Sequence, residues 1–249
     1  MPDNRDWKGL VLAAGKGSRF LQETGEAFPK VLRPVLGKPL VRYVLDTLAR
    51  AGVTDITLVV GFMAGEVMRE LGPGYGYVLQ PKQKGSGHAV ARAARHFSDF
   101  VGNLVIVCGD SPLFAADTIK SIMREHETSS PPITLVSAVL HDPSGYGRIV
   151  RDSQGRITGI VEETCASADQ RAIKEVNGGV YAFNAKWLFD NIDRMAINEA
   201  GEYNLTDMVR VAVELGQEVT TVPCESVELL GVNTPEELKT VAGILGSMG

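Results

Sequence analysis

The stretch Leu12-Ala13-Ala14-Gly15-Lys16-Gly17-Ser18-Arg19, followed by Pro29-Lys30, decides the fold of this chain. The apolar run at residues 9–12 predicts a buried strand, and the small residues after it let a ligand approach the backbone. Two glycines can turn their N–H groups toward one point, and Lys16, Arg19 and Lys30 add positive charge around it. We therefore predict a site for a nucleoside triphosphate, although a lone Gly-x-Gly pair is usually only a turn.

Two better-known phosphate-binding motifs are absent from this stretch. A dinucleotide fingerprint would require a third glycine where Phe20 stands, and a Walker A loop would require Gly-Lys-Ser/Thr at a fixed distance after another glycine. The pattern is therefore a different and longer one.

Composition limits the classes of function. The 249 residues are 44% hydrophobic and carry a net charge of -5, which argues against nucleic acid or an anionic membrane as the main partner. The sequence has neither a run long enough to span a membrane nor a secretory signal pattern. Cys108, Cys165 and Cys224 have no metal-like spacing and are typical of thiols in a reducing cytoplasm, where we expect the protein.

Apolar runs alternate with helical periodicity through the first half, which predicts an α/β fold with a mainly parallel sheet covered by helices on both faces. Strands are expected at 9–12, 56–60, 77–80 and 104–108, and helices at 40–48, 66–71, 88–97 and 117–127. The second half predicts strands at 133–139, 147–151, 157–162, 180–183 and 219–222, and helices at 205–215 and 235–245. Turn residues among these strands predict a small antiparallel subregion. We expect one domain over residues 1–249.

A second polar stretch, Gln80-Pro81-Lys82-Gln83-Lys84-Gly85-Ser86-Gly87-His88, lies between an expected strand and an alanine-rich helix. A glutamine amide can both donate to and accept from the edge of a nucleobase, and the glycines would let a base lie against the backbone. The alternative is a flexible loop with Ser86 as the helix cap. His88 is more typical of a packing residue than of a catalytic base.

Two oxygen-bearing side chains are candidates for a magnesium site. Asp110 directly follows the apolar run at 104–108, and Asn233 stands just before the helix at 235–245. Carboxylate and amide oxygens are the ligands that Mg²⁺ prefers, although each residue is also an ordinary helix or turn cap. Spacing alone does not bring the two together.

Polar residues and glycines interrupt the strands of the second half near Gly147, Glu162 and Asn177. Carboxylate, amide and backbone groups are what the hydroxyl groups of a sugar require. Ordinary turn chemistry explains the same residues equally well when each is taken alone.

Taken in order from about Gly9 to Leu238, these stretches resemble the sugar-1-phosphate nucleotidyltransferase family. The opening motif marks the family as a whole. The narrower marks are most similar to its bacterial branch that uses UTP and N-acetylglucosamine 1-phosphate: residues 80–89, 109–110, 145–149, 161–162, 175–177, 202–207 and 231–233. The resemblance implies a Rossmann-like sheet and Mg²⁺-dependent transfer of UMP to the sugar phosphate, giving UDP-N-acetylglucosamine, a cell-wall precursor, and pyrophosphate. It also implies a nucleotide-binding half at about 8–127 and a sugar-binding half at about 128–249.

The resemblance also assigns roles to residues. Arg19 and Lys30 would be catalytic and would neutralise the triphosphate, and Asp110 and Asn233 would bind Mg²⁺. Gly147, Glu162 and Asn177 would hold the sugar. The nucleotide would contact Leu12, Ala13, Ala14, Gly15, Lys16, Gly17, Gln80, Gln83, Gly85 and Ser86.

The family pattern leaves alternatives open. Gly178 and Thr164-Cys165 depart from it on the expected sugar side, so a glucose 1-phosphate acceptor, or dTTP or CTP as donor, is an alternative. A non-catalytic sensor of nucleotide sugars is another, and it would have no need of both Asp110 and Asn233. The sequence has no hexapeptide β-helix repeat, and it predicts no oligomeric state.

Overall fold

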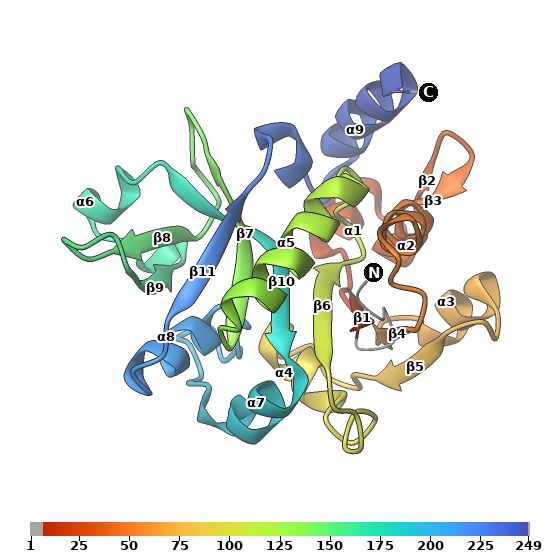
Figure 1. Cartoon of the computed structure of the whole chain (residues 1–249). Helices are drawn as coiled ribbons and strands as arrows, with labels where there is room; N and C mark the ends of the chain where they lie inside the picture. Colours follow the sequence, from red (N-terminus) through yellow and green to blue (C-terminus); the bar gives the residue numbers. More distant parts are fainter. Residues whose placement is uncertain (1–6, 249) are drawn as a thin grey trace.

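A computed structural model of the chain describes residues 7–248 (Figure 1). Its strands are β1 (Trp7–Ala13), β2 (Pro34–Val35), β3 (Lys38–Pro39), β4 (Ile56–Val60), β5 (Gly76–Leu79), β6 (Asn103–Cys108), β7 (Ile133–Val139), β8 (Arg148–Arg151), β9 (Ile157–Val161), β10 (Glu175–Asn184) and β11 (Val219–Pro223).

The α-helices are α1 (Ser18–Thr24), α2 (Leu40–Ala51), α3 (Ala64–Leu71), α4 (Ser86–Arg92), α5 (Ala116–Ser129), α6 (Ala168–Arg171), α7 (Ala185–Asn191), α8 (Asp207–Glu214) and α9 (Pro235–Met248). Short 3₁₀ helices are η2 (Lys30–Leu32), η3 (Glu163–Cys165), η4 (Ile192–Arg194) and η5 (Ser226–Leu229).

The central sheet has the strand order β11-β7-β10-β6-β1-β4-β5. The pairs β1–β4, β1–β6, β4–β5 and β7–β11 are parallel, whereas β10 runs antiparallel to both β6 and β7. All strands of this path except β10 therefore point the same way. The predicted mainly parallel sheet is confirmed, and the reversed central strand β10 is an addition that the sequence pattern did not reveal.

Helices cover both faces of the sheet, as expected. One hydrophobic cluster joins the sheet to α2, α3 and α5, and a second joins the opposite face to α4, α7 and α8. Neighbouring residues of β1 show this division, because Val11 packs in the first cluster and Leu10 in the second. Both side chains are fully buried. The alternation follows from the two-residue period of a strand.

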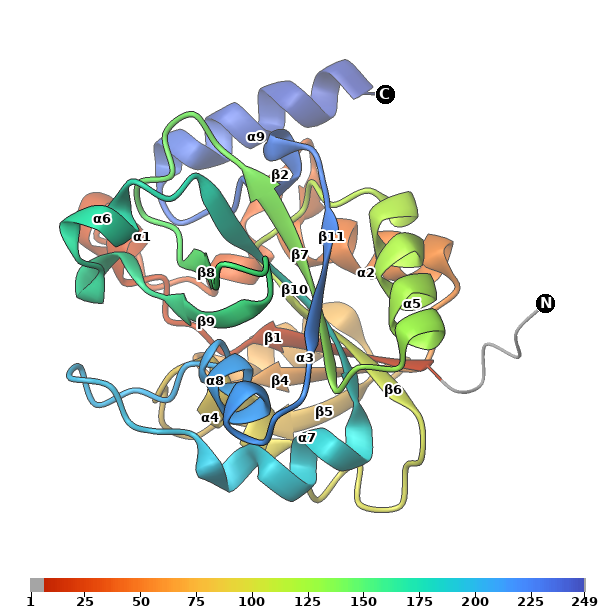
Figure 2. The ribbon, with the colours of Figure 1, turned by 60° about the vertical axis from the view of Figure 1, so that its left-hand side comes forward.

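The small antiparallel subregion consists of β8 and β9 with α6, and it lies beside the large sheet (Figures 1 and 2). It joins the sheet where Arg148 of β8 pairs with Val176 of β10. Strands of both halves of the chain share one sheet. The division into a nucleotide-binding and a sugar-binding half stays a prediction.

Two expectations about single elements were wrong. The strand expected at 180–183 begins at Glu175, because Gly178 and Gly179 form an irregularity inside β10 rather than a turn before it. The helix expected at 88–97 starts at Ser86 and ends at Arg92, after which bonds such as His96 N–H to Ala93 O tighten the chain into turns. The short helices α1, α6 and α7 were not predicted. No helix within residues 7–248 is long and apolar enough to cross a membrane.

Candidate active site

A cleft of about 610 Å³ opens at the carboxyl ends of β1 and β6. The chain leaves β1 toward β4 and leaves the neighbouring strand β6 toward β7, in opposite directions along the sheet, and such a point is where open α/β sheets bind ligands. The lining residues are Leu12, Ala14, Gly15, Lys16, Gly17, Ser18, Arg19, Lys30, Val31, Gln80, Gln83, Gly85, Ser86, Ala89, Cys108, Asp110, Glu202 and Asn233. Of the residues expected to hold the nucleotide, only Ala13 is not among them; it lies within β1 and packs in the core.

The glycine-rich loop connects β1 to α1 through a left-handed residue. Gly17 caps α1 with φ of 62°, a conformation that favours glycine. A Cβ atom at this position would lie 3.0 Å from Cβ of Lys30. Gly17 therefore lets the stem of Lys30 pack against the loop, while the side chains of Lys16 and Arg19 remain exposed.

Lys30 joins the two residues proposed to hold a cation. Its ammonium forms an ion pair with Asp110 and donates a hydrogen bond of 2.9 Å to Oδ1 of Asn233. Asp110 and Asn233 are 123 positions apart by their numbers, yet their oxygen atoms meet at one nitrogen. The side chains are only 12% exposed for Lys30 and 20% for Asp110, so this contact lies inside the cleft.

Backbone hydrogen bonds hold Asp110 and Asn233, the two residues that could offer oxygen ligands to a metal, in place. Gly109 N–H donates to Leu12 O at 2.9 Å, which fixes the end of β6 beside β1, and Val232 N–H donates to Asp110 O at 2.9 Å. The N–H of Asn233 donates at 2.6 Å to Glu237, a residue in the first turn of α9. The backbone of Asn233 is thus anchored at the start of α9, and the backbone of Asp110 at the end of β6.

The chemistry of this donor set fits Mg²⁺. Two oxygen atoms, one of them a carboxylate, converge on a point that already holds a positive group. Mg²⁺ is commonly bound through one or two protein groups, with substrate phosphates and water completing its shell. Within residues 7–248 there is no cluster of three or more His, Cys, Asp or Glu side chains, so an all-protein metal cage does not form there.

On the opposite side of the cleft, Gln80 has its amide nitrogen fully engaged. Nε2 donates to Gly85 O at 3.1 Å and faces Nδ1 of His88 at 2.9 Å. The carbonyl oxygen of Gly85 can only accept a hydrogen bond, so the Gln80 atom that faces it is the nitrogen of the NH₂ group. His88 Nδ1 then accepts the second hydrogen of this NH₂ group. Burial lowers the pKa of His88, with smaller effects of Arg92 and Lys84, which favours this neutral form. Oε1 of Gln80 remains as the free acceptor.

The glycines of the Gln80–His88 loop lie close to another part of the chain. A Cβ on Gly85 would lie 2.9 Å from Tyr203 N and closer still to Tyr203 O, and a Cβ on Gly87 would lie 2.5 Å from the sulfur of Met195. The backbone that approaches them is therefore the protein's own. The 195–206 loop, defined here as residues 195–206 between η4 and α8, packs against them.

Hydrogen bonds connect the same two loops. Tyr203 N–H donates to Lys84 O, and Gly87 N–H donates to Tyr203 O, both at 2.8 Å. The Ser86 hydroxyl accepts from Leu205 N–H at 2.9 Å. Ser86 lines the cleft as predicted, but its oxygen is used to fasten the 195–206 loop.

A second cavity, of about 950 Å³, adjoins the first, and Arg19 and Glu202 line both. Glu162 lines it, and the Thr206 hydroxyl donates to Glu162 Oε1 at 2.8 Å. Gly147 lies beside this carboxylate, with an ideal Cβ 3.4 Å from Glu162 Oε2. Asn177 N–H donates to Gly147 O at 2.9 Å. The three residues expected to hold the sugar are thus neighbours. Only Glu162 is among the residues that line the second cavity, and none of the three lines the first.

The side chain of Asn177 is engaged within its own strand. Nδ2 donates to the Tyr181 hydroxyl at 2.6 Å, and Oδ1 accepts from Gly179 N–H at 3.1 Å. Burial raises the pKa of Tyr181 far above its usual range, so the phenol stays protonated.

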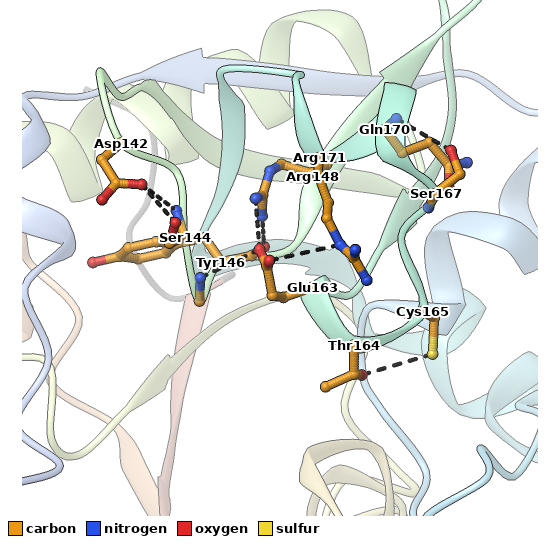
Figure 3. Close-up of polar contacts among 11 residues, drawn as sticks. Asp142, Ser144, Tyr146, Arg148, Glu163, Thr164, Cys165, Ser167, Gln170 and Arg171 are labelled. Carbon is orange, nitrogen blue, oxygen red and sulfur yellow. Dashed lines mark hydrogen bonds and ion pairs between the residues drawn. The ribbon is translucent and has the colours of Figure 1, made fainter.

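A buried arginine supports the sugar-side residues (Figure 3). Arg148 is 1% exposed, donates to Glu163 at 2.5 Å and also contacts Tyr146 O. Glu163 in turn accepts from Gly145 N–H at 3.3 Å, and the hydrogen bond from Arg148 lowers its pKa. Glu163 thus ties the turn before Gly147 to the buried Arg148.

Sequence reasoning missed Cys108, which lines the first cavity. Glu202 and Thr206 also line the cavities; the resemblance marked the 202–207 stretch but gave neither residue a role. Burial raises the pKa of the Cys108 thiol to about 12, with the charge of Asp110 acting in the same direction. The thiol stays protonated and is not a nucleophile.

The family model for nucleotidyl transferases matches residues 8–226. The bifunctional protein GlmU of Geobacillus thermodenitrificans is 40% identical over 226 residues, which are 90% of this chain and 48% of that protein. GlmU of Pelotomaculum thermopropionicum is 38% identical over 238 residues, 95% of this chain and 51% of that protein. The chain therefore spans about half the length of these curated relatives.

A solved structure has the same fold. The putative glucose-1-phosphate thymidylyltransferase of Bacillus anthracis superimposes with a TM-score of 0.77 over 96% of this chain and 94% of that one, at 23% identity. The chain belongs to the nucleotidyl transferase family. The family resemblance stated from the sequence is confirmed.

Proposed function

We propose that this protein transfers UMP from UTP to N-acetylglucosamine 1-phosphate, giving UDP-N-acetylglucosamine and pyrophosphate. The observation that carries the proposal is the meeting of Asp110, Asn233 and Lys30 beside the glycine-rich loop. This arrangement offers a triphosphate a cation site, two further positive side chains and a set of backbone N–H groups. The identity of 38–40% to GlmU proteins supports the uridylyltransferase assignment within the family.

The free acceptor of Gln80 supports a uracil or thymine base. Its Nε2 is held by Gly85 O and His88, so Oε1 is what it can offer to a ligand. Uracil and thymine carry an imide N–H at the matching edge, whereas cytosine carries an acceptor there. The geometry therefore favours UTP or dTTP over CTP.

In the proposed reaction, an oxygen of the sugar phosphate forms a bond to the α-phosphorus while the bond to the β-phosphate oxygen breaks. The acceptor oxygen is already anionic, so no protein base is required. Arg19 lines both cavities and would hold the two substrates in line. Lys30 would neutralise charge on the departing pyrophosphate. Asp110 and Asn233 would hold Mg²⁺, which supplies Lewis-acid stabilisation of the phosphate oxygens.

The second cavity is the proposed acceptor site. Glu162 lines this cavity, with Gly147 beside its carboxylate and Asn177 bonded to Gly147, and Glu162 would offer a carboxylate oxygen to sugar hydroxyl groups. A non-catalytic sensor remains the second candidate, but the pairing of Asp110 with Asn233 at one point argues for metal-assisted chemistry.

The test is pyrophosphate release measured over a matrix of UTP, dTTP and CTP with N-acetylglucosamine 1-phosphate and glucose 1-phosphate. We expect the highest kcat/KM with UTP and N-acetylglucosamine 1-phosphate. Glucose 1-phosphate as the preferred acceptor would correct the sugar assignment. Release from no pair, by a folded protein that binds UDP-N-acetylglucosamine, would favour the sensor.

A further inference from the structure

We propose that the Lys30 ammonium and the divalent cation compete for the same oxygen atoms, so that metal entry releases Lys30 toward the phosphates. The inference rests on the proposed function, because it concerns the cation site of that reaction. It adds a coupling between two groups that otherwise have separate roles.

The contacts of Lys30 carry the first step. Its nitrogen is bonded at once to the Asp110 carboxylate and to Oδ1 of Asn233. These are the two protein oxygens that fit Mg²⁺ in this cleft. Lys30 Nζ contacts Oδ2 of Asp110 and Oδ1 of Asn233, so a metal ion that used these two oxygens would take the place of the ammonium, and two cations sharing one carboxylate repel each other.

Anchoring of the oxygen donors carries the second step. Asp110 O accepts from Val232 N–H, and the Asn233 backbone is fixed to Glu237. Lys30, in contrast, holds its place through a long side chain, and only its stem is confined by Gly17. The group free to move when a metal ion arrives is therefore the lysine nitrogen.

The exchange would change the net charge of the cleft. With Lys30 bound, Asp110 is neutralised within the protein. After exchange, the cleft holds a divalent ion and a free ammonium beside Lys16 and Arg19. Positive charge would then increase at the moment when a triphosphate can accept it, so metal and nucleotide would each strengthen binding of the other.

The test measures Mn²⁺ binding without nucleotide, from the electron paramagnetic resonance signal of the free ion. We expect Lys30→Met to bind Mn²⁺ about tenfold more tightly than the natural chain, because hydrogen bonds to charged groups are each worth about that factor or more. The control is Lys16→Met, which removes an equal charge from the same cleft; no described residue forms an ion pair with Lys16. We expect less than about a threefold change for it, since exposed charges are screened.

A second measurement uses the natural chain and so does not depend on the folding of a variant. Acetylation of Lys30 by a limiting amine-reactive reagent is followed by mass spectrometry as Mn²⁺ is added, with Lys16 as the internal reference. We expect the reactivity of Lys30 relative to Lys16 to rise severalfold with metal, and Asp110→Asn to raise it without metal.

Equal Mn²⁺ affinities for the Lys30→Met and Lys16→Met variants would overturn the proposal, and so would a Lys30 reactivity that metal leaves unchanged. Neither measurement involves a sugar phosphate or a nucleotide. A wrong substrate assignment would therefore appear only in the pyrophosphate-release assay. The two measurements on Mn²⁺ binding and Lys30 reactivity would test the metal competition independently of it.

Discussion

Gly85→Ala is the substitution that tests most directly how the two proposed substrate cavities are joined. Gly85 has φ of 94° and ψ of 172°, a region in which an alanine costs about 1–3 kcal/mol. The new methyl group would also press on Tyr203, 2.9 Å from its nitrogen and nearer to its oxygen. Overpacking of this kind costs a further 1–3 kcal/mol or so. Together the two effects predict a loss of about 4 kcal/mol in the free energy of unfolding.

The matched control is Gly145→Ala. Gly145 has φ of 84°, but an added Cβ would meet nothing within 4 Å. Its cost is therefore the backbone strain alone, about 1–2 kcal/mol. The gain from a stiffer unfolded chain is common to both variants and cancels in the comparison. The difference of about 2 kcal/mol corresponds to roughly 4–8 °C in melting temperature for a chain of this size.

Differential scanning calorimetry of the two variants and the natural protein measures this difference. Gly85→Ala should also raise KM for both substrates, because Tyr203 separates from Lys84 and Gly87 and the 195–206 loop lines the acceptor cavity. Equal melting temperatures for Gly85→Ala and Gly145→Ala would refute the argument that Tyr203 backbone packs against Gly85.

Three further outcomes follow from single contacts. Asp110→Asn should lower kcat about 1,000-fold while leaving the circular dichroism spectrum unchanged, because the developing charge loses its electrostatic partner; near-normal turnover would contradict the assigned role. Thr206→Val should raise KM for the sugar phosphate about tenfold and leave KM for the nucleotide unchanged, with Thr206→Ser close to normal, since only the hydrogen bond to Glu162 is lost. Burial lowers the pKa of His126, which contacts Thr134, to about 4. Because the unfolded pKa is near 6.5, the stabilisation is present above that pH and is lost as pH falls toward 4, by up to about 3 kcal/mol. Urea unfolding at pH 7 and pH 4.5 should show a smaller decrease in the free energy of unfolding for His126→Gln than for the natural chain.

Local pattern was sufficient for the parallel part of the fold. Strands such as β4 are short apolar runs between turn residues, and Ile56–Val60 was predicted to the residue. Strand β10 was predicted only in part, because two adjacent glycines indicate a turn when the sequence is read alone. In the folded chain, β7 pairs with β10 both before and after the irregularity at Gly178-Gly179, and β6 pairs with β10 only after it. The pairing of β10 with strands distant in the sequence outweighed the local turn signal of the two glycines. The spacing of residues along the sequence does not reveal that pairing.

The site shows the same division between what residue types indicate and what the fold decides. Chemistry at strand ends pointed to Lys30, Asp110 and Asn233 separately, since each residue type suits one task near a triphosphate. Their mutual contact depends on α9 placing Asn233 against the end of β6, which no spacing predicts. In the proposed exchange, Lys30 would therefore have two alternative partners, the Asp110 carboxylate and a phosphate chain. The choice between them would depend on whether a second cation is present, and it would be a property of the assembled cleft rather than of any motif in the sequence.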